Sequence, residues 1–274
     1  MCVLGPDRQR RQSERVRTRQ VRAAEQLLTE LGISDPADIE LEAIAHCVGV
    51  EVHYRRLASC EAQIIGYKDR AVVYVSPDTS PHRRRFSTGH ELGHWHHHRG
   101  RSFVCRASDI GNPIDEKSKD AERQADAYSG DLILPPFMVG PRLERLGEIS
   151  LDGIAELASQ FKASVTATAI RTVRMTRQPL ILVAHNLFGR MWQWPSITAG
   201  QIRVRGDVDS RSSAFVSMMG GNKVSAARKE PANYWFDRRH IEQFDVRVQS
   251  CRTLQGEVLT LLRVLDPRMA EIFG

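Results

Sequence analysis

Apolar residues recur with helical spacing through the first two thirds of the chain and give way to shorter runs beyond Pro179. Proline, glycine and Ser-Asp-Pro signals divide the first part into segments. Helices are expected over about 15–31, from Ser34-Asp35-Pro36 to Gly49, from Ser80-Pro81 to Arg99, and over about 117–132, 136–146, 151–161 and 164–176. A strand is expected at 51–57 and a β-hairpin at 63–67 and 71–75.

Beyond Pro179 the pattern predicts strands at 180–184, 191–194, 244–248 and 258–262. The expected fold class is therefore α+β. A helical domain with a small β-sheet is predicted over 23–178, including a helical hairpin at about 151–176, after an N-terminal arm at 1–22. A smaller α/β domain is predicted over 179–274.

One predicted helix carries the sequence His90-Glu91-Leu92-Gly93-His94. Side chains four positions apart lie on one face of a helix, with about 5–6 Å between their Cβ atoms, so His90 and His94 can bind one metal ion. Glu91 lies beside them and can take a proton from a water at an open coordination position.

A catalytic zinc needs a third protein ligand. The helix expected at 117–132 offers Glu122 as that ligand, and Asp126, one turn later, as the acceptor for the other ring nitrogen of a ligand histidine. The competing interpretation is a solvated helix face whose carboxylates pair with Arg123 or Lys119; the histidine pair upstream favours the metal. Two imidazoles and a carboxylate indicate one zinc ion, with manganese or iron as alternatives.

Two motifs together resemble a known family. Residues 85–94 read R-F-S-T-G-H-E-L-G-H, and residues 122–135 read E-R-Q-A-D-A-Y-S-G-D-L-I-L-P. Both are similar to motifs of the ImmA/IrrE metallo-endopeptidases, and the resemblance covers about residues 36–175. Gly89 and Ser129 both stand where that family commonly has alanine.

The resemblance implies a zincin-like domain in which His90, His94 and Glu122 bind zinc and Glu91 is the general base. It also implies a role in bacterial transcription regulation and stress response. The expected substrate is a helix–turn–helix transcriptional repressor, and the C-terminal domain would sense a signal or select the substrate.

Three further groups near the motifs leave alternatives open. Tyr128 and His98 are candidates for contacts to the substrate or the transition state, although His98 can equally be ordinary helix surface. Cys105 lies between the two motif helices. It is either a thiolate that coordinates zinc and holds the enzyme latent, a sensor of oxidation or, as we favour, a plain buried cysteine.

Charge and cysteine content limit the possible partners and the cellular location. The net charge is +6, but residues 1–22 alone hold seven arginines against Asp7 and Glu14, which is +5 and leaves +1 for the rest. A solvated basic tail is favoured there over nucleic-acid binding. The five scattered cysteines form no CxxC pair, and no apolar run approaches the roughly 18 residues of a membrane span, so a cytoplasmic protein without a membrane partner is expected.

Residues 154–167 have the pattern of a helix–turn–helix DNA reader, and we favour a structural αα-hairpin packed on the peptidase core. A second hypothesis for the whole chain is a regulatory DNA- or protein-binding module in which zinc is structural. The sequence leaves the oligomeric state open.

Overall fold

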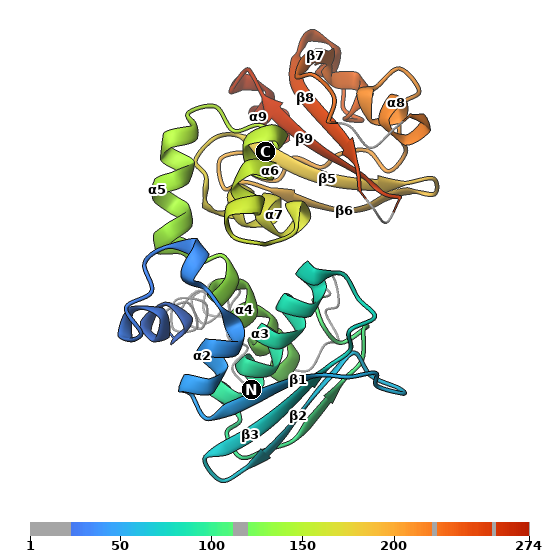
Figure 1. Ribbon diagram of the computed structural model, residues 1–274. Helices are drawn as coiled ribbons and strands as arrows, with labels where there is room; N and C mark the ends of the chain where they lie inside the picture. The colour runs from blue at the N-terminus through green and yellow to red at the C-terminus, as the bar shows by residue number, and fades with distance from the viewer. Residues whose placement is uncertain (1–22, 112–119, 221–223, 254–255, 274) are drawn as a thin grey trace, which may run out of the picture. The chain divides into compact units, whose positions relative to one another are not determined.

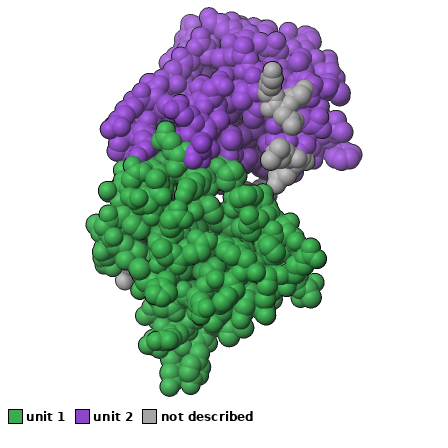
Figure 2. Space-filling model, viewed as in Figure 1, with its two compact units in different colours: residues 1–139, 160–164 green, residues 140–159, 165–274 purple. Residues whose placement is uncertain are grey.

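The computed structural model describes residues 23–111, 120–220, 224–253 and 256–273; the predicted basic arm lies outside them. The chain divides into two compact units, coloured separately in Figure 2. The first comprises the residues up to Val139 together with Gln160–Ser164, and the second comprises Gly140–Ser159 and Val165–Gly274. The domain limits predicted from the sequence, with their boundary at Pro179, remain a prediction.

The first unit begins with helical turns at residues 23–30, a 3₁₀ turn η1 (Pro36–Asp38) and helix α2 (Leu41–Cys47). The sequence predicted a single helix over 36–48. The structure interrupts it at Ile39, whose buried side chain enters the core and whose carbonyl accepts a 3.0 Å hydrogen bond from Arg85.

A four-stranded sheet follows, made of β1 (Val50–Tyr54), β2 (Ala62–Tyr67), β3 (Arg70–Val75) and β4 (Phe103–Cys105). Its order is β1-β3-β2-β4; β1 runs parallel to β3, and β2 runs antiparallel to both β3 and β4. The hairpin β2–β3 forms as predicted. Strand β4 was not predicted, because three residues are too few to show a period.

Helices α3 (Pro81–His97) and α4 (Asp120–Ile133) lie side by side (Figure 1). Ser80 caps α3 by accepting from the Arg83 amide at 3.3 Å, with Pro81 in the first turn. The helices approach closely at Gly93, where an added Cβ would lie 2.7 Å from the Cα of Ala125. Glycine at this position therefore allows the two metal-motif helices to pack backbone against backbone.

The second unit contains part of α5 (Pro136–Leu146), α6 (Leu151–Gln160), α7 (Val165–Met175) and α8 (Ser213–Met219). Its sheet comprises β5 (Leu180–Asn186), β6 (Gly189–Pro195), β7 (Arg228–Pro231), β8 (Asp245–Arg252) and β9 (Val258–Val264). Short elements η2 (Ala232–Tyr234), η3 (Ile241–Gln243) and α9 (Arg268–Glu271) complete it.

The strand order is β6-β5-β9-β8-β7, and every pairing is antiparallel. The α/β label predicted for this part of the chain is therefore wrong in its strict sense, and α+β describes both units. Hairpins join β5 to β6 and β8 to β9, where an α/β sheet would need helical crossovers. Strand β7 and helix α8 were not predicted.

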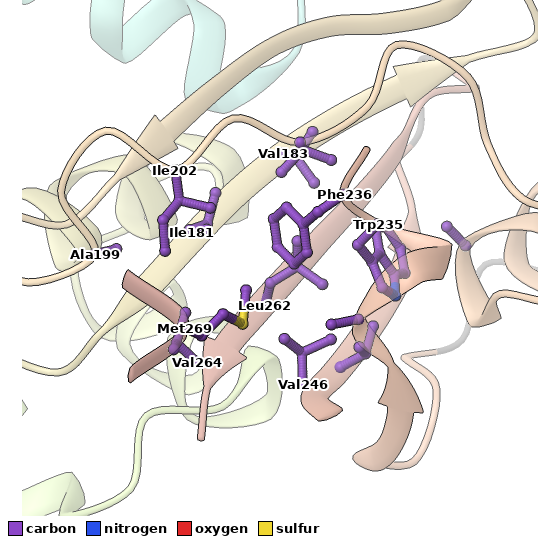
Figure 3. Close-up of a cluster of buried hydrophobic side chains, with 14 of the residues drawn as sticks. Ile181, Val183, Ala199, Ile202, Trp235, Phe236, Val246, Leu262, Val264 and Met269 are labelled. Carbon is purple, nitrogen blue, oxygen red and sulfur yellow. The ribbon is translucent and has the colours of Figure 1, made fainter. Parts of the chain in front are cut away.

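Apolar side chains cover both faces of the second sheet. On one face, Ile181, Val183 and Leu262 pack with Trp235 and Phe236 (Figure 3). On the other, Leu180, Leu182 and Leu261 pack with residues of α6 and α7, including Ile154 and Val173. The apolar residues of the hairpin α6–α7 thus cluster with this sheet, whereas packing on the first unit was predicted.

Among the described residues, no helix combines the length and the apolar character needed to cross a membrane.

Candidate metal centre

Three potential metal donors converge where α3 packs against α4. Nε2 of His90 lies 3.0 Å from Nε2 of His94, and Oε2 of Glu122 lies 3.1 Å and 3.3 Å from these two nitrogens. Both histidines are buried, with 0% and 1% of their surfaces exposed. Cys105, on β4, places its Sγ 3.5 Å from Nε2 of His94.

The spacing of these atoms fits the coordination shell of one small cation. Bond lengths to zinc of about 2.0–2.1 Å for nitrogen and about 2.3 Å for sulfur, at tetrahedral angles, separate two nitrogens by about 3.3 Å and nitrogen from sulfur by about 3.6 Å. The donor atoms of His90, His94, Cys105 and Glu122 all lie within 4.8 Å of one another. This group can therefore bind a metal ion.

Asp126 fixes the orientation of one histidine. Its Oδ1 lies 2.8 Å from Nδ1 of His90, and its two carboxylate oxygens accept from the Gly111 amide at 2.9 Å and 3.0 Å. Burial opposes protonation of His90, but hydrogen bonds to Asp126 and Glu122 outweigh it and raise the pKa of His90 to about 9. With the Nδ1 proton directed at Asp126, a cation would bind at Nε2 in place of the second ring proton.

Glu91 is a completely buried glutamate, with 0% of its surface exposed, and neither carboxylate oxygen has a hydrogen-bond partner among the described residues. Burial raises the pKa of Glu91 to about 8, although the neighbouring His90 lowers it in part. An unsatisfied buried carboxyl costs folding free energy, and such groups concentrate at functional sites. Its altered pKa suits a group that exchanges protons near neutral pH.

The other two predicted contact residues occupy different surroundings. His98 lies beside His94, with 5.9 Å between ring centroids, and burial lowers its pKa. The buried ring of Tyr128 stacks on His96 at 5.0 Å and meets His97 edge-on at 5.9 Å. His98 thus flanks the donor group directly, whereas the ring contacts of Tyr128 are with the end of α3.

A buried ion pair that sequence reasoning missed supports the site from the sheet side. Glu61, 7% exposed, accepts hydrogen bonds from Arg83 Nε and from the Ser87 hydroxyl, each at 2.5 Å. Arg83 also donates to the carbonyls of Ala107 at 3.1 Å and Ile110 at 2.9 Å. No motif marks Glu61, because its partners lie 22 and 26 positions away.

With this geometry in view, comparison with known proteins identifies the segment. Residues 45–173 match the family described as the IrrE N-terminal-like domain, Peptidase M78. This segment is similar to an IrrE N-terminal-like domain. The predicted ImmA/IrrE resemblance is confirmed, and a peptidase kind of activity is supported at the level of the family.

A solved structure described as a Mycobacterium tuberculosis transcriptional regulator is similar in fold. Its TM-score is 0.59 at 17% sequence identity, and the match covers 92% of this chain and 94% of that one. The similarity extends through both compact units. None of the curated proteins compared with the sequence matches it.

Proposed function

We propose that this protein is a zinc-dependent endopeptidase of IrrE type, in which His90, His94 and Glu122 hold the ion and Glu91 is the general base. The observation that carries the proposal is the convergence of three donor atoms within 3.3 Å of one another, next to a buried glutamate that has no hydrogen-bond partner among the described residues. In a core that serves only folding, such a glutamate would lower stability with no compensating role.

A zinc ion in this site would supply Lewis acidity, which polarises a peptide carbonyl and lowers the pKa of water to about 7. The chain's own groups do the remaining work. Glu91 takes the proton of the attacking water and delivers it to the leaving amine. Asp126 holds His90 in one tautomer, and His98, whose ring lies beside that of His94, is proposed to form a hydrogen bond with the substrate.

The proposed substrate is a helix–turn–helix transcriptional repressor. Support comes from the family of residues 45–173 and from the described role of the M. tuberculosis protein as a transcriptional regulator, which is consistent with a regulatory pathway. The second unit is proposed to select the substrate or sense a signal, and Tyr128 to support the end of α3 near the substrate.

The test is Glu91→Gln, assayed for bound metal and for cleavage of a repressor encoded beside this gene. The amide has nearly the same shape but cannot accept the proton, so metal content should be unchanged and cleavage should fall by about 100- to 10,000-fold. The matched control is Glu144→Gln, which removes an exposed carboxylate of α5. Full cleavage by Glu91→Gln, or a purified wild-type protein that binds no metal, would refute the proposal.

A second candidate function is a regulatory module in which the ion is structural. Cys105 favours it, because four protein donors around one ion are typical of structural zinc sites, whereas catalytic sites keep one position open. Under this hypothesis Glu91→Gln should leave the regulatory output unchanged.

A further inference from the structure

Cys105 is the one member of the donor group that an open hydrolytic site does not need. Given the proposed endopeptidase, we propose that Cys105 is a fourth metal ligand that keeps the enzyme in a closed, latent form. Its sulfur would take the coordination position that water needs for hydrolysis, and displacement of the sulfur would open the site.

The surroundings of Cys105 are those of a ligand. Its Sγ lies 3.5 Å from Nε2 of His94, close to the separation of about 3.6 Å expected for nitrogen and sulfur on one zinc ion. Cys105 is only 1% exposed, and its Sγ lies within 4.8 Å of a carboxylate oxygen of Glu122. A cysteine that serves only to fill a core is normally surrounded by apolar groups, whereas this one lies against an imidazole and a carboxylate.

The backbone around Cys105 is anchored to the same residues that build the site. Cys105 pairs with Ala62 in the sheet, and its carbonyl accepts from the Glu61 amide at 2.9 Å. The following segment is fixed by Arg83, which bonds to the carbonyls of Ala107 and Ile110, and by Asp126, which accepts from Gly111. The sulfur is thus positioned by groups that also orient His90 and support α3.

The anchoring strand is short enough to move. Strand β4 lies at the edge of its sheet, and its one partner among the described strands is β2, with which it pairs over three positions. A substrate or partner that pulled β4 from β2 would break few hydrogen bonds while it withdrew the sulfur. The structure therefore combines a precisely anchored ligand with a support that can be released.

The decisive experiment uses the full-length protein loaded with cobalt(II), in wild-type, Cys105→Ser and Cys105→Ala forms. A thiolate ligand gives cobalt(II) an intense near-ultraviolet charge-transfer band, which wild type should show and both variants should lack. Zinc affinity, measured by competition with a chelator, should fall in both variants by about tenfold or more, since even an outer partner of a ligand is worth about 10- to 100-fold. The control is Cys251→Ser, which removes a buried cysteine of β8 in the second unit and should keep the band.

Cleavage of fluorescently labelled casein gives a separate reading. Cys105→Ala should cleave it faster than wild type, and Glu91→Gln should retain the charge-transfer band while it cleaves nothing. Absence of the band in wild type, with equal zinc affinity in Cys105→Ser, would refute the ligand; measurable and equal cleavage by wild type and Cys105→Ala would refute latency. A band in wild type, with no form of the protein cleaving either casein or the repressor encoded beside this gene, would support the ligand and refute the proposed endopeptidase instead.

Discussion

Two of the buried glutamates, Glu91 in the first compact unit and Glu230 in the second, differ sharply in their hydrogen bonds. Glu230 of β7 is 3% exposed and accepts hydrogen bonds from Arg228 at 2.8 Å and from the Ser213 amide and the Trp235 indole at 2.9 Å each. Glu91 of α3 is 0% exposed and has no such partner among the described residues. The hydrogen bonds of Glu230 stabilise the fold, whereas the burial of Glu91 without such bonds lowers the stability of the fold.

The same contrast extends to the neighbours. Around Glu230, the hydroxyls of Ser213, Ser250 and Thr260 contact one another at 3.5 Å and 2.9 Å beneath an apolar cluster. Around Glu91, imidazoles and a second carboxylate crowd together at 3.0–3.3 Å. A buried polar group whose hydrogen bonds are formed within the protein indicates a structural role. A buried polar group that lacks such bonds indicates a site for a ligand or a substrate.

The largest expected effect tests that contrast directly. Glu230→Ala leaves the buried donors of Ser213 and Trp235 without an acceptor and should destabilise the protein by about 3–5 kcal/mol. Glu91→Gln should leave stability unchanged or slightly higher, since an uncharged amide is cheaper to bury. Urea unfolding of both variants measures the difference; equal losses of stability would contradict the assignment of Glu91 to function.

His185 of β5 is an exception in the second unit, and it sharpens the comparison. It is 1% exposed, and neither ring nitrogen has a hydrogen-bond partner among the described residues. Burial lowers the pKa of His185 to about 4; the charge of Arg190 adds to this shift, whereas the nearby backbone of Arg205 and the charge of Asp207 partly oppose it.

The unfolded chain therefore binds the proton more readily than the folded one between pH 6.5 and 4. Stability should be complete above about pH 6.5 and fall by ~3 kcal/mol as the pH approaches 4. Unfolding curves across this range should show a shallower dependence for His185→Leu than for wild type. Parallel curves would mean that His185 finds a partner, such as an ordered water.

Much of this architecture follows from local signals. Ser80-Pro81 starts α3 as the capping pattern requires, and the alternating runs after Pro179 become β5, β6, β8 and β9. Elements that depend on distant partners were missed: β4 and β7 are three and four residues long, and each exists through pairing with a longer strand. Antiparallel order was also beyond reach, since strand periodicity does not record direction.

The site residues also differ in how far the sequence could predict them. The spacing along one helix predicted His90, Glu91 and His94, and the spacing along another predicted Glu122 and Asp126. For Cys105 the sequence offered a zinc-binding thiolate as an alternative but favoured a plain buried cysteine, because its 3.5 Å approach to His94 depends on β4. Glu61 carries no local signal at all, because its importance lies in its contacts with Arg83 and Ser87.

A smaller effect is expected at Asp126, a hydrogen-bonded carboxylate whose loss should lower the affinity for the metal ion. Asp126→Asn keeps the shape but weakens the bond to Nδ1 of His90, so zinc affinity should fall by about 10- to 100-fold, or about 1.4–2.7 kcal/mol. Asp120→Asn, an exposed change on the same helix, is the control. Chelator competition measures both, and equal affinities would leave Asp126 with a structural role only.

The smallest expected effect concerns the two departures from the family pattern, Gly89 and Ser129. An alanine Cβ at position 89 would lie 2.5 Å from Oγ of Ser129 and 3.2 Å from its Cβ, and that hydroxyl donates to the Phe86 carbonyl at 2.8 Å. The hydroxyl of Ser129 thus occupies the space that Gly89 leaves free, so the departures compensate each other across α3 and α4.

Gly89→Ala should displace the hydroxyl and cost about 1 kcal/mol through the lost hydrogen bond and crowding. Ser129→Ala should cost a similar amount by removing the same bond. The double variant restores the alanine pair of the family and should be more stable than the two single losses added together, with a coupling of about 1 kcal/mol. Strict additivity in thermal unfolding would show that the two positions changed independently, and that the α3–α4 interface tolerates each change alone.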